Sequence, residues 1–244
     1  MEETKINQPK KNKINFTKII SIFIIVSLMV SLIYSAIMLI QSITVEDFAQ
    51  THLKTKSDYI LMVLQCFIGI IGFFLPSILE HRLDFSMPDK MYFAFIVFLY
   101  CAIYLGEIQS FYYLIPDWDL ILHIFSGAMW GAFGFSVILM LNSRDIGLKL
   151  SPLFCAIFAF CFAMAIGAIW EIYEFTVDKF FGTNMQKFML ENGTKLVGQD
   201  ALADTMEDII VDLIGSLIMS IIGFISMQNK PSWLRKLSFK KSDQ

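Results

Sequence analysis

The residues from Ile19 to Ile40 read IISIFIIVSLMVSLIYSAIMLI and contain no charged side chain. About 20 consecutive apolar residues are enough for an α-helix to cross the roughly 30 Å hydrocarbon core of a bilayer. This run is too long for the apolar part of a cleavable signal peptide, and no small-residue cleavage site follows it. The stretch therefore predicts a retained transmembrane helix.

Five more apolar runs follow, and each is expected to be helical because backbone polar groups in lipid must be satisfied within the segment. Only 17% of the 244 residues are charged, against about a quarter in soluble domains. The predicted fold class is an all-α polytopic transmembrane helix bundle with about six spans. The spans are 19–40, 59–79, 91–108, 120–141, 152–170 and 209–227. They form a membrane domain, 19–227, between basic tails at 1–18 and 228–244.

Small residues at helical spacing mark the faces on which these helices are expected to pack closely. They are Ser27, Ser31 and Ser35, then Gly127 and Gly131, then Ala159, Ala163 and Gly167. The four cysteines lie inside apolar runs and form no CxxC pair. We therefore expect them to be small packing residues.

Lysine and arginine in the loops predict the orientation, because cytoplasmic loops carry an excess of them. Of the 19 basic residues, 14 lie in the tails and in the second and fourth loops, and five lie in the other loops. The first group should be cytoplasmic, which places both termini inside. The net charge of −3 gives no indication of nucleic-acid binding. The expected partner of the apolar spans is membrane lipid.

The same topology places most membrane-proximal acidic residues at the outer end of the bundle. Residues three or four apart share a helix face, so three helices each present a polar stripe there. The stripes are Asp119 and His123; Glu171, Glu174 and Asp178; and Asp204, Asp208 and Asp212. Glu107 ends the third span on the face of Tyr100 and Tyr104. Ionisable residues inside a membrane indicate a functional site.

Carboxylates gathered at low dielectric need compensation, and three solutions exist. Some of them are protonated, or a lysine of the long 171–208 connection (Lys179, Lys187 or Lys195) folds back, or a metal ion binds. Carboxylates with one histidine suit Mg²⁺, Mn²⁺ or Zn²⁺. The metal hypothesis assigns His123, Glu171, Asp208 and Asp212 as ligands and Glu174 or Asp119 as general base. Glu107 and Asp204 are further candidates.

Simpler explanations exist for single members of this cluster. Glu174, Asp178 and Glu207 are also explained as solvated residues at a helix end. Asp204 and Asp208 suit the positive end of a helix dipole, which leaves Asp212, one turn deeper, unexplained. Residues 185–190 of the long connection are expected to form a short interfacial helix.

The motifs Asp119-Leu-Ile-Leu-His123, Trp170-Glu-Ile-Tyr-Glu174-Phe, Asp204-Thr-Met-Glu-Asp208 and Asp212-Leu-Ile-Gly215 resemble the YjdF-type family of uncharacterised bacterial inner-membrane proteins. More distantly they resemble the VanZ-like group, one member of which is associated with resistance to the glycopeptide teicoplanin. Leu120 replaces a basic residue of that group, and Phe175 departs from its pattern after the glutamate. The resemblance implies a multi-pass protein of the bacterial cytoplasmic (inner) membrane without a settled activity.

Three functions from different classes fit these residues. The first is a metal-assisted hydrolase or transferase that acts on a lipid-linked envelope substrate. The second is an ion- or proton-coupled transporter, although the cluster lies at one end of the bundle and no inverted repeat is present. The third is a non-catalytic scaffold whose polar cluster holds helices together. Substitution of the cluster residues distinguishes the three functions. An enzyme should lose activity while it stays folded, a transporter should be sensitive to charge at more than one depth, and a scaffold should lose stability.

Overall fold

The computed structural model describes residues 16–44, 54–83, 85–143, 150–190, 193–229 and 240–241. Within these residues, six helices are long and apolar enough to cross a membrane. They are α1 (Phe16–Thr44), α3 (Lys56–Leu83), α4 (Asp89–Leu99) continued by the π-helix η1 (Tyr100–Ile108), α6 (Trp118–Ser143), α7 (Pro152–Phe181) and α8 (Ala203–Asn229). The prediction of an all-α polytopic bundle is confirmed. Most of both basic tails lies outside the described residues.

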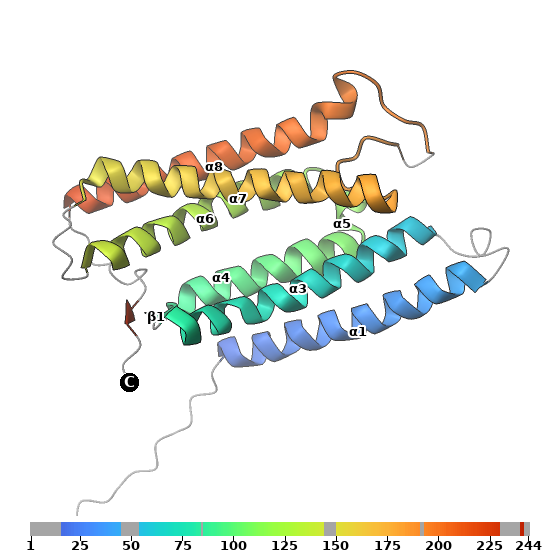
Figure 1. Ribbon diagram of the computed structural model, residues 1–244, viewed down its shortest axis with the longest axis horizontal. Coiled ribbons are helices and arrows are strands. Elements are labelled where there is room, and N and C mark those ends of the chain that lie inside the picture. The colour runs from blue at the N-terminus through green and yellow to red at the C-terminus, as the bar shows by residue number, and fades with distance from the viewer. Residues whose placement is uncertain are drawn as a thin grey trace, which may run out of the picture.

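The helices form two neighbouring groups (Figure 1). α6, α7 and α8 pack against one another, while α1 packs against α3, and α4 with η1 contacts both groups. The short helix α5 (Phe111–Leu114) leads from η1 into α6. At the opposite end, β1 (Phe85–Ser86) pairs antiparallel with β2 (Lys240–Lys241). The first turn of α1 and the last turn of α8 lie at this same end of the bundle (Figure 1), as an even number of spans requires.

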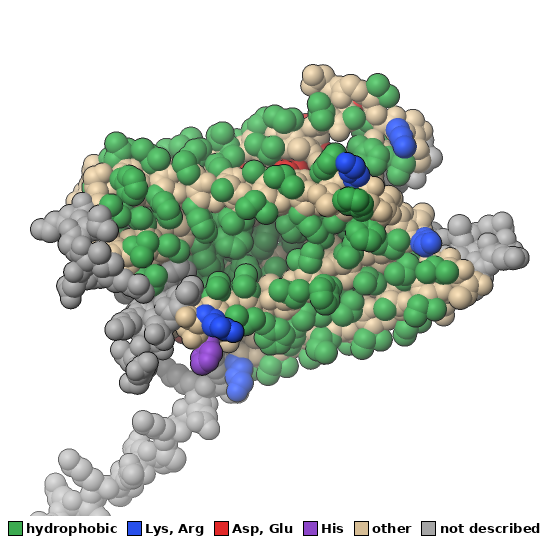
Figure 2. All heavy atoms as spheres, viewed as in Figure 1, with side chains coloured by type: hydrophobic (Ala, Val, Ile, Leu, Met, Phe, Trp, Pro, Cys, Tyr) green, Lys and Arg blue, Asp and Glu red, His purple; other side chains and the backbone are tan. Residues whose placement is uncertain are grey.

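The surface of the bundle is apolar over most of its length, with basic side chains near the two ends (Figure 2). α8 shows the cause. Its exposed side includes Leu213, Leu217 and Ile221, whereas its buried residues are polar or small. Those buried residues are Asp208, Asp212, Gly215, Ser216, Ser220, Gly223 and Ser226. A helix that turns its apolar side outward is suited to lipid and not to water.

The predicted packing faces are confirmed except at Ser27, which is partly exposed. The other small residues of those rows are buried between helices. The apolar core includes Phe95, Trp130 and Phe133, whose ring centroids lie 5.2 to 6.2 Å apart. Cys66 is buried in the core, but Cys161 is exposed, so the packing role predicted for the cysteines is wrong there.

Candidate functional site

The helices that carry the polar stripes are longer than predicted. α7 continues past Trp170 to Phe181, where Gly182 (φ 66°) ends it and donates its N–H to the Asp178 carbonyl. A left-handed residue at this position is the usual way to end a helix. α8 begins at Ala203, one residue before the first acidic residue of its stripe. The acidic residues of both extensions therefore lie on regular helix.

Because α6, α7 and α8 pack pairwise, their stripes meet in one buried cluster. Its most buried side chains, at most 7% exposed, are His123, Glu171, Glu174, Asp208 and Asp212. Asp119 and Asp204 form its rim, with 18% and 17% of their side chains exposed. The structure thus brings together all the site residues predicted on these three helices. We call these seven residues the acidic cluster.

His123 lies at the centre of the acidic cluster. Its Nδ1 is 3.3 Å from Asp212 Oδ2, and the Ser126 hydroxyl donates to Asp212 Oδ1 at 2.8 Å. Its Nε2 faces two other carboxylates, at 3.7 Å from Asp119 Oδ1 and 3.9 Å from Asp208 Oδ2. In the protonated ring both nitrogens face carboxylates as donors. In the neutral ring with its proton on Nδ1, that proton is donated to Asp212 and the Nε2 lone pair points toward Asp119 and Asp208. This is the arrangement of a metal-ligating histidine held by an outer carboxylate.

Three glycines allow the helices to approach closely around Asp212. A Cβ on Gly127 would lie 3.1 Å from the Asp212 Cα, and one on Gly167 would collide with the Asp212 carboxylate. A Cβ on Gly215 would collide with the backbone carbonyl of Ile124. Gly127 and Gly167 of the predicted small-residue rows, together with Gly215, thus let Asp212 reach His123 from the neighbouring helix.

Two carboxylates of the cluster are buried without hydrogen-bond partners among the described residues. Neither oxygen of Asp208, a residue only 1% exposed, has a hydrogen-bond partner there. The same is true of the two oxygens of Glu171, which is 5% exposed. The Thr205 hydroxyl neighbours Glu171 and accepts a bond from the Gln186 amide at 2.8 Å, so its own proton is available to Glu171. Asp208 has no such neighbour, and a buried carboxylate without a partner is costly.

The cluster contains two groups of side chains whose ligand atoms lie within 4.8 Å of one another. They are Asp119, His123 and Asp208, and His123, Glu171 and Glu174. Two ligands of one Mg²⁺ or Zn²⁺ ion lie about 3 to 3.4 Å apart, so the observed spacing needs only small side-chain shifts. Asp212 belongs to neither group, and both of its oxygens already have partners. This donor set fits the predicted Mg²⁺, Mn²⁺ or Zn²⁺.

The connection between α7 and α8 folds back over this end of the bundle. Asp178 holds its first part, accepting bonds from the Thr183 hydroxyl at 2.6 Å and from the backbone N–H groups of Met185 and Gln186 at 2.8 and 3.0 Å. These bonds form a turn, and residues 187–190 are extended or irregular. The predicted interfacial helix at 185–190 is therefore wrong, because its second half pairs with residues 194–196: Met189 forms a bridge with Lys195, and the Leu190 N–H donates to the Thr194 carbonyl at 2.9 Å.

Among the described residues, Lys187 is the lysine whose ammonium reaches the acidic cluster. Its ammonium bonds the Asp119 carboxylate, and Asp204 Oδ1 at 2.7 Å, which links α6 to α8. Its backbone has a left-handed φ of 44°, a conformation rare outside glycine and frequent at functional sites. Burial alone would lower the pKa of Lys187, but the two carboxylates raise it above its ordinary value. One predicted form of compensation is thus present, and among the described residues it leaves Asp208 with His123, at 3.9 Å, as its ion-pair partner.

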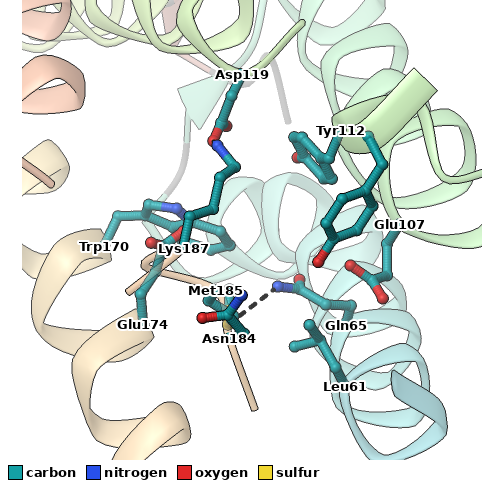
Figure 3. Close-up of a pocket in the computed structure, with 11 residues that line it drawn as sticks. Leu61, Gln65, Glu107, Tyr112, Asp119, Trp170, Glu174, Asn184, Met185 and Lys187 are labelled. Carbon is teal, nitrogen blue, oxygen red and sulfur yellow. Dashed lines mark hydrogen bonds and ion pairs between the residues drawn. The ribbon is translucent and has the colours of Figure 1, made fainter. Parts of the chain in front are cut away.

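Glu107, the remaining candidate, lies apart from the cluster across a cavity of about 40 Å³ (Figure 3). Gln65, Glu107 and Tyr112 line one side, and the other side includes Asp119, Glu174 and Lys187. Burial, together with the negative charges of Asp119 and Glu107, raises the pKa of the Tyr112 hydroxyl, which stays protonated. The cavity therefore adjoins the cluster and shares residues with both candidate ligand groups.

Gln65, Tyr112 and the tethering role of Asp178 were not predicted from the sequence. Gln65 lies within an apolar span and Tyr112 in a short connection, and neither has a spaced polar partner in the sequence. A lone glutamine in a predicted span was a usable signal, because an uncharged polar group in lipid needs a hydrogen-bond partner. The partners of Asp178 are mostly backbone groups, which no side-chain pattern reveals.

Comparison with known proteins places the chain in one family. Residues 20–229 match the model of the family described as "Predicted membrane protein (DUF2238)". The match covers most of the chain, so the protein belongs to this family of multi-pass membrane proteins. No curated protein and no solved structure matches.

Proposed function

We propose that this DUF2238 protein binds one divalent metal ion in the acidic cluster and uses it for hydrolysis or group transfer on a lipid-linked substrate. The single observation that carries the proposal is the burial of the Asp208 carboxylate without a hydrogen bond in the described part of the chain. Asp208 is 1% exposed, both of its oxygens lack a hydrogen-bond partner among the described residues, and Oδ2 lies 3.9 Å from His123 Nε2. A metal ion would supply positive charge directly at Asp208, whose ion-pair partner among the described residues, His123 Nε2, is too distant for a hydrogen bond.

The surroundings of each residue indicate whether it is a metal ligand, a positioning residue or a general base. Asp208, Asp119 and His123 Nε2 are the proposed ligands on one side, and Glu171 offers an oxygen on the other. Asp212, first expected to be a ligand, is reassigned to hold His123 by its Nδ1. A bound divalent ion would polarise a substrate oxygen or activate a water. Glu174 lines the cavity beside the cluster, which supports it over Asp119 as general base.

The lipid-linked character of the substrate is inferred from position. The cluster lies at the end of long apolar helices that expose leucine and isoleucine on the outside, where lipid head groups meet protein. The resemblance to YjdF-type proteins is compatible with the family match, and the bacterial inner membrane and an envelope substrate are part of the proposal. The comparisons add no support for a VanZ-like relationship, so we propose no glycopeptide role.

Metal content tests the proposal directly. The full chain would be purified in mild detergent without chelator, and its Mg, Mn and Zn measured by mass spectrometry. His123→Ala and Asp208→Asn would be compared with wild type and with Glu207→Gln, a matched control because Glu207 precedes Asp208 in α8 and is exposed. Near-stoichiometric metal in wild type and control, lost in the two variants, would support the proposal.

Thermal unfolding of the same samples makes the opposite result informative. If no metal binds, Asp208 is a buried carboxylate without a hydrogen bond among the described residues, and Asp208→Asn should be as stable as wild type or more stable. Absence of metal together with a stabilised Asp208→Asn would overturn the proposal and favour the scaffold hypothesis. If metal binds, Asp208→Asn should instead lose the stabilisation that the metal gives wild type.

A further inference from the structure

The cavity beside the acidic cluster has a second wall to which the proposed metal chemistry assigns no role. It lies between the two helix groups, with Gln65 from α3, Glu107 from η1 and Tyr112 from α5 facing Glu174 from α7 (Figure 3). Asp119 and Glu174 belong both to the cavity and to the candidate ligand groups. A molecule in the cavity would therefore contact the proposed metal centre.

The local backbone is arranged to build this second wall. The span changes from α-helix to π-helix over Tyr100–Ile108, a feature frequent at functional sites. Gly106 leaves room for the Tyr112 ring, since a Cβ there would lie 2.5 Å from Tyr112 Cε2. Ser110, with a φ of 60°, turns the chain back into α5, and the Lys54 ammonium bonds its hydroxyl at 2.7 Å. The turn brings Tyr112 over the π-helix, on the wall that carries Glu107.

The charges of the cavity favour a cationic occupant. Among the described residues, the carboxylates of Glu107 and Glu174 have no hydrogen bond or ion pair within 4.0 Å. The Lys187 ammonium is taken by Asp119 and Asp204. The Lys54 ammonium bonds the Ser110 hydroxyl and lies 3.5 Å from the backbone carbonyl of Glu107, so its charge acts on the Glu107 carboxylate without an ion pair within 4.0 Å. Two acidic groups at low dielectric therefore face the cavity without a direct ion-pair partner among the described residues.

The size of the cavity narrows the class of occupant. One water needs about 10 to 15 Å³ of such space, so a cavity of about 40 Å³ holds a few water-sized groups. A primary ammonium on a methylene group fits and can donate to the acceptors of the walls, whereas a trimethylammonium group has no N–H to donate. Half-exposed Tyr113, in α5, also lines the cavity, so the wall reaches the protein surface at the end of the spans where head groups lie.

We infer that this cavity is a subsite for the primary ammonium of a lipid head group, bound between Glu107 and Glu174. Binding of the head group does not depend on the proposed function. Only the statement that the bound lipid is the substrate of the reaction rests on it. Three N–H donors of an ammonium match the acceptor groups on the walls, which include Gln65 and the Tyr112 oxygen. Met185 covers Gln65 from the loop, with its sulfur 3.7 Å from the amide nitrogen.

Native mass spectrometry of the full chain in mild detergent tests the subsite. The protein would be offered an equimolar mixture of phosphatidylethanolamine and phosphatidylcholine with identical acyl chains. We expect wild type and the control Glu207→Gln to bind the ethanolamine lipid about tenfold more, and Glu107→Gln to lose most of that preference. Equal binding of both lipids by wild type, or a preference that survives Glu107→Gln, would overturn the inference.

Two further measurements keep the result interpretable. Tyr112→Phe retains the ring that packs on Gly106 and should weaken the preference a few-fold, so the test survives if Glu107→Gln fails to fold. Methylammonium, with tetramethylammonium as control, tests a free amine; stabilisation by methylammonium without a lipid preference would overturn the head-group assignment. Metal content, measured in the same samples, should be unchanged in Glu107→Gln. Lipid selectivity without metal would refute the proposed reaction alone, and metal without selectivity would refute the subsite alone.

Discussion

His123 has two different nitrogen environments, and the difference predicts the effect of Asp212→Asn. Asp212 bonds Nδ1 and the Ser126 hydroxyl, so it orients the ring without offering a free oxygen. Losing such an outer partner typically lowers metal affinity by about 10- to 100-fold. Isothermal titration with Zn²⁺ or Mn²⁺ should show that loss for Asp212→Asn and no measurable binding for Asp208→Asn. Equal losses in both variants would contradict the division of roles.

Lys187 holds Asp119 by one oxygen while the other oxygen faces His123. We therefore expect the ammonium to position Asp119 for the metal, and Lys187→Met should weaken metal binding several-fold. Lys195→Met is the control, because Lys195 belongs to the same connection and is exposed. A higher metal affinity in Lys187→Met would show instead that the ammonium competes with the ion for Asp119.

At the scale of the helix, close contact between α6 and α8 depends on Gly215. A Cβ there meets the Ile124 carbonyl, which belongs to the backbone and cannot rotate away. Gly215→Ala should destabilise the protein by about 1 to 3 kcal/mol, as overpacking does. Gly72→Ala is the matched control, since its Cβ would lie 3.7 Å from Leu99, an ordinary contact. Thermal unfolding in detergent should separate the two variants, and equal unfolding temperatures would argue against close helix packing.

The α7–α8 connection should be protected from protease as long as Asp178 holds it. Asp178→Ala leaves the Met185 and Gln186 N–H groups without their acceptor, which costs about 1 to 3 kcal/mol when such groups are buried. Trypsin should then cleave after Lys187 or Lys195 several-fold faster than in wild type. Glu207→Gln should cleave at the wild-type rate, and an unchanged rate in Asp178→Ala would refute the tether.

The pKa of Lys187 predicts how this protection depends on pH. The folded-state pKa is raised above the unfolded value of about 10.4. The ion pair therefore contributes stability that is fully present below that value and is lost only as the pH rises through the folded pKa. The rate of tryptic cleavage in the connection, corrected for protease activity on a free peptide, should be the same at pH 7 and pH 9. Faster cleavage at pH 9 would contradict a raised pKa of Lys187.

Sequence periodicity and charge were enough to predict the six spans, because lipid requires long apolar helices. They also predicted which face of each helix is polar, so His123 and Asp208 were identified. They could not predict the change to a π-helix at Tyr100, which depends on packing against α3 and α5. The turn at Met185 was likewise missed because Asp178 acts through backbone groups. Local patterns therefore identified the residues of the cluster but not the opposite wall of the cavity.

At the scale of the whole molecule, the excess of basic residues and the shared end of α1 and α8 give one orientation. Val197, 82% exposed in the α7–α8 connection, should face the extracytoplasmic side. Ser86, exposed at the opposite end of the bundle, should face the cytoplasm. In a chain whose four native cysteines are replaced by serine, Val197→Cys should react with a membrane-impermeant maleimide in intact cells. Ser86→Cys should react only after permeabilisation.

The reverse labelling pattern would place the acidic cluster at the cytoplasmic face. The metal centre could still form there, since it depends on helix contacts and not on orientation. An envelope substrate presented on the outer leaflet would then be excluded, because the cavity would open to the cytoplasmic leaflet. The ammonium subsite would remain testable with the same two lipids, as phosphatidylethanolamine offers its head group on either side. Labelling thus separates the chemistry of the site from the compartment in which it acts.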